Sequence, residues 1–172
     1  PTGTIYSKFN TYLNFQNYLE LSNIGSKTTQ FTITVYDDKG SIVSDSYRAR
    51  IAAKNEVHLA LDEILEKKDS YGIIKISYDD LSGAKLMGRV SSYRSNSADG
   101  HILGFSHELL REQQGTSFAI ANTNNPNGGK DSIENWIELR NLATSRQRFR
   151  VKLYDASGKT VHDYGRIAVN SM

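Results

Sequence analysis

The chain has 172 residues, a formal net charge of +2 and no cysteine. The length suffices for one large domain or two small ones. The absence of Cys excludes a disulfide framework and Cys-ligated zinc, and no apolar run is long enough to predict a membrane-spanning segment. The near-neutral charge argues against a dedicated nucleic-acid-binding protein, although it leaves room for a local basic strip.

A β-hairpin is predicted over residues 31–46. Residues 31–35, Phe-Thr-Ile-Thr-Val, alternate apolar and polar side chains, a period of two that places the apolar ones on one face of a strand. Asp37 and Gly40 in the following segment are typical turn residues, because Asp bonds to nearby backbone and Gly adopts positive φ. The second strand of the hairpin is expected over residues 41–46.

The middle of the chain predicts further short strands over residues 56–61, 71–78 and 86–94. Short helical turns are expected over residues 62–67 and 106–112. Many short strands separated by turn residues are typical of an antiparallel sandwich.

The segment 17–54 repeats without a gap at 135–172, an offset of 118 residues. Of the 38 aligned positions 11 are identical, whereas chance would give about two or three. The sequence therefore predicts an all-β fold, an antiparallel β-sandwich built from an internal duplication whose second copy is incomplete. We expect a first module over residues 1–115 and a partial second copy over residues 116–172.

A partial module leaves one apolar sheet face uncovered, which is unusual in a monomer. Three arrangements would cover it: one sandwich of roughly 11 strands in which the second copy packs on or pairs with the first, pairing with another chain, or a natural chain that continues further. The first arrangement is favoured. On that arrangement Phe31→Asp and Phe149→Asp are both expected to unfold the protein.

The sequence contains no recognisable catalytic constellation, and we expect neither an enzyme, a cofactor nor a metal site. His107 and Glu108 begin a pattern typical of zinc proteases, but Arg111 stands where the second His is required. A hydrolase with a site at the rim of the sheet remains a third alternative, to be tested by changing His101 or His107.

A basic strand is the most suggestive candidate site. Arg146, Arg148, Arg150 and Lys152 alternate with apolar residues, so a strand places all four cations on one face. The functional interpretation is a site for an anionic partner such as acidic polysaccharide, lipopolysaccharide or nucleic acid. The structural interpretation is a solvated strand whose charges protect a sheet edge.

Tyrosines form the second candidate site, for which we select Tyr12 and Tyr93 as ligand-binding residues. Exposed rings make flat platforms on which sugars pack, although Tyr is also an ordinary half-buried residue of strands. Tyr18 and Trp136 occupy equivalent positions in the two copies. We therefore expect both in the core or at its rim.

Each copy reads aromatic-apolar-Glu-Leu-x-Asn, at residues 18–23 and 136–141, followed by an alternating strand and Tyr-Asp-x-x-Gly. This pattern resembles the tandem β-sandwich repeat modules of bacterial secreted and cell-envelope proteins. The resemblance implies an extracellular or cell-envelope location and a binding or structural role.

These observations lead to two hypotheses on function. The first is a non-catalytic protein of the bacterial surface or secreted fraction, acting in adhesion, assembly or cell-envelope structure. Its partner would be a protein or polysaccharide at the cell surface, or a second copy of the chain. The alternative is a carbohydrate-binding module that recognises polysaccharide, including acidic polysaccharide.

Overall fold

A computed structural model describes residues 2–65, 69–79, 85–96, 100–111, 139, 141–155 and 157–171. The chain divides into two compact units. Unit 1 comprises Pro1–Glu112 with Met172, and unit 2 comprises Gln113–Ser171. Within the described residues no helix is long and apolar enough to cross a membrane.

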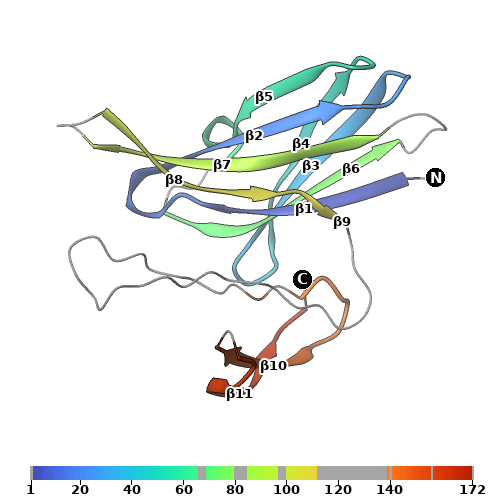
Figure 1. The fold of residues 1–172 in the computed structure, drawn as a ribbon. Helices are drawn as coiled ribbons and strands as arrows, with labels where there is room; N and C mark the ends of the chain where they lie inside the picture. The colour runs from blue at the N-terminus through green and yellow to red at the C-terminus, as the bar shows by residue number, and fades with distance from the viewer. Residues whose placement is uncertain are drawn as a thin grey trace. The chain divides into compact units, whose positions relative to one another are not determined.

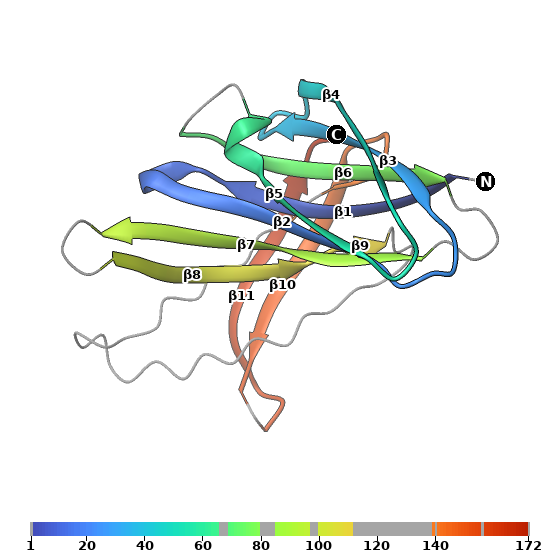
Figure 2. The same cartoon turned by 90° about the horizontal axis from the view of Figure 1, so that it is seen from above.

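Unit 1 is built from two antiparallel sheets (Figures 1 and 2). The five-stranded sheet has the order β4-β3-β6-β1-β9, and its strands are β1 (Thr2–Asn10), β3 (Thr29–Asp37), β4 (Ile42–Ile51), β6 (Tyr71–Asp79) and β9 (Leu110–Arg111). The four-stranded sheet has the order β5-β2-β7-β8, and its strands are β2 (Phe15–Asn23), β5 (Glu56–Ala60), β7 (Leu86–Asn96) and β8 (Gly100–Glu108). Two 3-10 turns, η1 (Tyr12–Asn14) and η2 (Leu61–Glu63), connect strands.

The core of unit 1 lies between these two sheets, which makes the unit a β-sandwich. Buried apolar residues of β3 and β6 form one cluster with those of β2 and β7. In β3, Phe31, Ile33 and Val35 are at most 1% exposed, while Thr32 and Thr34 between them are half-buried. The period of two therefore predicted both the strand and its inner face.

Two buried asparagines hold the ends of β2. Asn17 Oδ1 accepts hydrogen bonds from the backbone N–H of Asn10 (3.2 Å) and from Ser92 Oγ (2.8 Å), and its Nδ2 donates to the Asn10 carbonyl (2.8 Å). Asn23 Nδ2 donates to the carbonyls of Lys27 (2.7 Å) and Ile51 (3.2 Å). These bonds satisfy backbone groups at the ends of β1 and β4 and in the loop that follows β2.

The described strands of unit 2 are β10 (Gln147–Tyr154) and β11 (Thr160–Val169), which form a two-stranded antiparallel sheet. The pairing of β10 with β11 repeats that of β3 with β4 at the offset of 118. Phe31 lies opposite Ala49, and Phe149 lies opposite Ile167. The register shifts that follow, at Val35 and Tyr36 in β3, recur at the equivalent positions of β10.

The turns and loops of the two hairpins also match. The carboxylates of Asp37 and Asp155 accept hydrogen bonds from the backbone N–H groups two and four residues later, and Gly40 and Gly158 have φ of 85° and 83°. Asn141 Nδ2 donates to the carbonyls four and 28 residues later, as Asn23 Nδ2 does. The same residue types thus produce the same local structure twice.

The apolar faces of the two hairpins differ in burial. Phe149, Val151 and Leu153 are half-buried, whereas their counterparts in β3 are fully buried. Packing of the second copy on the first, as favoured above, stays a prediction, and so do the proposed module boundaries. Trp136 and most of the expected second copy before β10 lie outside the described residues.

The prediction of a helical turn over residues 106–112 is wrong for residues 106–111, the part of this segment that the structure describes. Residues up to Glu108 belong to β8, which pairs with β7 and places His107 opposite Val90. Leu110 and Arg111 form β9 and pair with β1. Pairing with neighbouring strands here overrides a local pattern compatible with a helix. The other expected turn, over residues 62–67, is seen only as η2, and residues 66–68 lie outside the description.

Candidate binding surfaces

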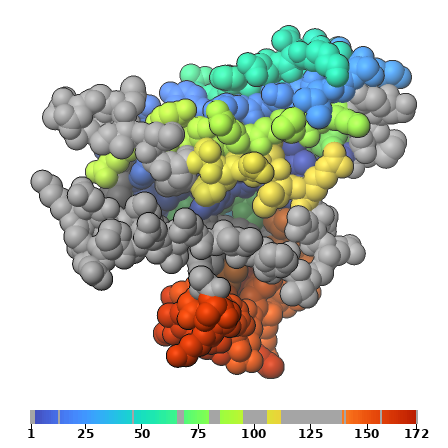
Figure 3. All heavy atoms as spheres, viewed as in Figure 1, coloured from blue at the N-terminus to red at the C-terminus, as the bar shows by residue number. Residues whose placement is uncertain are grey.

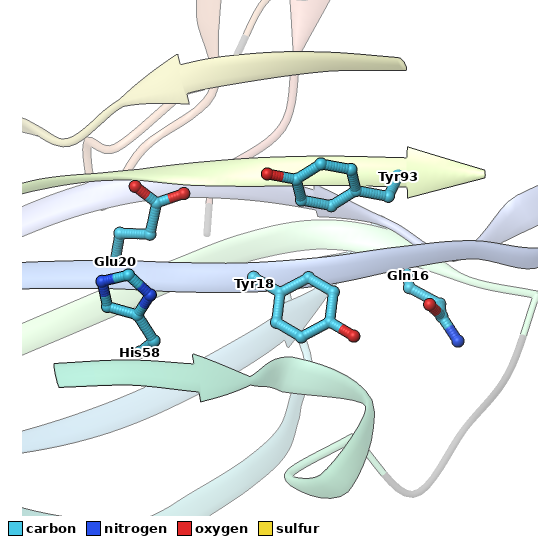
Figure 4. A pocket seen from close by; sticks show the side chains of 5 residues that line it. All are labelled: Gln16, Tyr18, Glu20, His58 and Tyr93. Carbon is cyan, nitrogen blue, oxygen red and sulfur yellow. The ribbon is translucent and has the colours of Figure 1, made fainter. Parts of the chain in front are cut away.

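A shallow hollow of about 330 Å³ lies on the outer face of the four-stranded sheet. It is lined by Gln16, Tyr18 and Glu20 of β2, His58 of β5 and Tyr93 of β7 (Figure 4). We call it the tyrosine hollow. The lining residues of β2 point outward because Leu19 and Leu21, which alternate with them, are buried in the core. Figure 3 shows β5, β2, β7 and β8 side by side on this face of unit 1.

The two tyrosine rings of the hollow contact each other. The centroids of Tyr18 and Tyr93 are 5.6 Å apart, and the ring planes are inclined by 74°. Tyr18 lies opposite Ser91 in the register, so Tyr93 is its diagonal neighbour on the adjacent strand. Both side chains are half-buried, which leaves part of each ring at the surface.

Two side chains of β7 hold the carboxylate of Glu20 in place. Arg89 Nε donates a hydrogen bond to Glu20 Oε2 (2.7 Å), and Ser91 Oγ donates to Oε1 (2.8 Å). Burial raises the pKa of Glu20, but the hydrogen bonds from Arg89 and Ser91, together with the nearby charges of Arg89 and His58, lower it further than burial raises it, so the pKa is lowered overall. The hollow therefore presents an ionised, immobilised acceptor beside the rings.

A second cavity of about 750 Å³ adjoins the tyrosine hollow, because Tyr18 and His58 line both. Its other walls include Ser44 and Tyr47 of β4 and Glu63 of η2. It therefore lies where β5 and β4, the edge strands of the two sheets, approach each other.

The two tyrosines selected from the sequence lie in different places. Tyr93 lines the hollow, but Tyr12 does not. Tyr12 lies in η1 with 44% of its surface exposed, and its ring is 5.8 Å from that of Tyr71. Sequence reasoning missed Tyr18, Glu20 and His58, of which Tyr18 was expected in the core or at its rim. The alternation of Leu19 and Leu21 with Tyr18 and Glu20 in the sequence is the signal that could have placed Tyr18 and Glu20 on the outer face.

The predicted basic residues lie on or beside β10. Arg148, Arg150 and Lys152 share a face of this strand, and Arg146 immediately precedes it. Arg166 of β11 lies directly opposite Arg150 and adds a cation that the sequence pattern of β10 could not indicate. Like charges directly opposite one another destabilise a sheet.

Asp163 is the acidic side chain paired with these cations among the described residues. Arg150 Nη2 is 2.7 Å from Asp163 Oδ2, and Lys152 Nζ is 3.8 Å from the same oxygen. The hydrogen bond from Arg150, with a second from the backbone N–H of Gly165, lowers the pKa of Asp163 to about 2. The face keeps an excess of positive charge.

We expect the Asp163 carboxylate to titrate near pH 2 in a ¹³C NMR experiment. Because its folded pKa lies below the unfolded value of 3.8, its contribution to hairpin stability is present above pH 3.8 and is lost as pH falls toward 2. Arg150→Gln should move the midpoint up toward the ordinary range. Lys152→Gln, which removes the longer contact, should move it less, and the opposite order would contradict the assigned geometry.

The described residues offer no observation in favour of the hydrolase alternative. The side chain of His101 lies outside them, and His107 is half-buried in β8. Within the same part of the chain no three His, Asp or Glu side chains are grouped to hold a metal ion.

No protein family matches the chain, and neither does any curated protein. Among solved structures, the crystal structure of Thermotoga maritima 1070 resembles it with a TM-score of 0.51 and 17% sequence identity. The match covers 64% of this chain and 94% of that one. At this identity the likeness shows the fold alone, and the class that it supports is the all-β sandwich.

Proposed function

We propose that the protein is a non-catalytic β-sandwich protein with an adhesive role at the bacterial cell surface, and that the tyrosine hollow binds carbohydrate. The observation that carries this proposal is the contact between Tyr18 and Tyr93, bordered by Glu20 and His58. Apolar sugar faces pack on aromatic rings, and hydroxyl groups hydrogen-bond to charged and amide side chains. The open shape of the hollow suits a segment of a polysaccharide.

The state of Glu20 supports binding rather than hydrolysis. Glycoside hydrolases use two carboxyl groups, one of which has a raised pKa and donates a proton. Glu20 is the carboxyl group that lines the tyrosine hollow, and its pKa is lowered. Its oxygens already accept hydrogen bonds from Arg89 and Ser91. Such a group orients hydroxyls and does not act as a general acid.

An assembly role is the second candidate, and the hairpin of unit 2 favours it. The side chains of Phe149, Val151 and Leu153 are half-buried although their counterparts in β3 are fully buried. An apolar face of this kind is typical of a surface that associates with another protein.

We expect Tyr18→Ala and Tyr93→Ala each to weaken carbohydrate binding about tenfold, because each removes a ring from the packing surface. The ligand would first be found on a panel of neutral and acidic glycans, and affinities would then be measured by calorimetry. Tyr12→Ala is the matched control, since Tyr12 is exposed outside the hollow. Equal losses in all three variants would contradict the assignment of the site.

Salt separates the two candidate surfaces in the same experiment. Packing on the tyrosine rings should persist at 1 M salt, where exposed charges are screened within about 3 Å. Binding that disappears at high salt would assign the ligand to the basic face of β10 instead.

A further inference from the structure

We propose that unit 2 takes up an extended strand of a partner protein along the edge of β10, and that this strand carries acidic residues opposite Arg150 and Lys152. The partner strand would alternate apolar and acidic side chains. This inference rests on the β10–β11 hairpin, and it stands independently of carbohydrate binding in unit 1.

The place of the added strand follows from the repeat of the hairpin. In unit 1, β3 pairs with β4 on one side and with β6 on the other. In unit 2, β10 and β11 reproduce the register of β3 and β4, and β10 pairs only with β11 among the described strands. The edge of β10 that corresponds to the β6 side is therefore the site at which a strand would be added.

The apolar side of the partner strand follows from the same comparison. Phe31 lies opposite Tyr78, Ile33 opposite Ile76 and Val35 opposite Ile74, all fully or almost fully buried. An isolated two-stranded hairpin is at best marginally stable in water, and a third strand adds backbone hydrogen bonds and cross-strand contacts. A strand on β10 would place apolar side chains opposite the equivalents of these residues, which are Phe149, Val151 and Leu153.

The cations of β10 indicate which residues the partner strand would carry on its polar face. In unit 1, Thr32 lies opposite Ser77 and Thr34 opposite Lys75. The positions equivalent to Thr32 and Thr34 are Arg150 and Lys152. Both cations contact the single carboxylate of Asp163, so the pair keeps a net positive charge. A strand with a cation in the place of Lys75 would be repelled, and one with acidic residues at both positions would be attracted.

The same charges argue against a second copy of the chain as the occupant. Antiparallel pairing of β10 with its own copy would bring together the two sets of Arg148, Arg150 and Lys152 on one face of the sheet. That arrangement concentrates like charges at the new contact, which costs free energy. A foreign acidic strand avoids this cost.

Two synthetic nine-residue peptides test the proposal against the full chain. Both are based on the sequence of β6, Tyr71–Asp79. The acidic peptide carries Lys75→Glu and Ser77→Glu. The basic peptide retains Lys75 and carries Ser77→Lys. We expect the acidic peptide to bind at least tenfold more tightly in fluorescence anisotropy. Hydrogen exchange measured by NMR should then show new protection in β10. Equal binding of the two peptides, or no binding of the acidic one, would overturn the proposal.

A charge reversal in the chain tests the register. Lys152→Glu should weaken binding of the acidic peptide about tenfold and strengthen that of the basic peptide. Lys159→Glu is the matched control, because it makes the same charge change at an exposed residue outside β10. Equal effects of both variants would show nonspecific attraction and overturn the proposal. Sedimentation would also overturn the proposal if it showed a dimer that dissociates on Lys152→Glu, because a second copy of the chain would then occupy the edge of β10.

Discussion

Phe31→Asp is expected to unfold unit 1. The ring of Phe31 is 1% exposed in the core cluster and lies 6.3 Å, centroid to centroid, from that of Tyr47. Removing a buried Phe side chain costs about 3–5 kcal/mol, and burying an unpaired carboxylate adds to this loss. The sum is comparable with the whole stability of a small domain, about 5–15 kcal/mol. Circular dichroism with urea denaturation would measure the effect.

Phe149→Asp is the matched comparison, since Phe149 occupies the equivalent place in β10. Its side chain is half-buried, so the carboxylate can reach water, and we expect a loss of about 1 kcal/mol. The sequence alone predicted that both substitutions would unfold the protein. From the structure we expect a large loss of stability for Phe31→Asp and a small one for Phe149→Asp. A loss at Phe149 as large as that at Phe31 would contradict the exposure of the β10 face.

Gly72→Ala is expected to destabilise unit 1 by about 3 kcal/mol, because a side chain at this position overlaps backbone. A Cβ atom on Gly72 would lie 1.9 Å from the Tyr36 carbonyl oxygen and 3.0 Å from Phe9 Cε1. Gly72 pairs with Asp37 of β3 and with Phe9 of β1. The carbonyl cannot rotate away without breaking this pairing, so the strands must separate locally.

The control for Gly72→Ala is Gly158→Ala. Gly158 has φ of 83° and nothing within 4 Å of an added Cβ. Its substitution introduces backbone strain of about 1 kcal/mol and no clash. Thermal unfolding of the two variants would compare these costs. A loss at Gly72 no greater than that at Gly158 would contradict the close approach of β3 to β6.

The elements that the sequence predicted well depend on neighbouring residues. The alternation over residues 31–35 indicates a strand with one buried face, and Asp37 with Gly40 indicates the turn that follows. Each property acts within a few residues, through side-chain direction and backbone conformation. This explains why the hairpin was recognised in both places where it occurs.

The elements that the sequence did not predict depend on distant strands. Residues 106–111 are compatible with a helical turn when taken alone, but they pair with β7 and β1. The tyrosine hollow requires β5, β2 and β7 to be neighbours, and the basic face requires Arg166 of β11 to lie opposite Arg150 of β10. No local pattern specifies such neighbours.

The amino-acid sequence thus establishes the all-β class, the two hairpins and the alternation of apolar and basic residues in β10. Strand order decides the rest: which tyrosines meet, which carboxylate is held by Arg89, and which apolar face stays half-buried. The physical reason is one of range. Dihedral preferences and side-chain alternation act between neighbours in the chain, whereas a binding surface forms where pairing brings separate strands together.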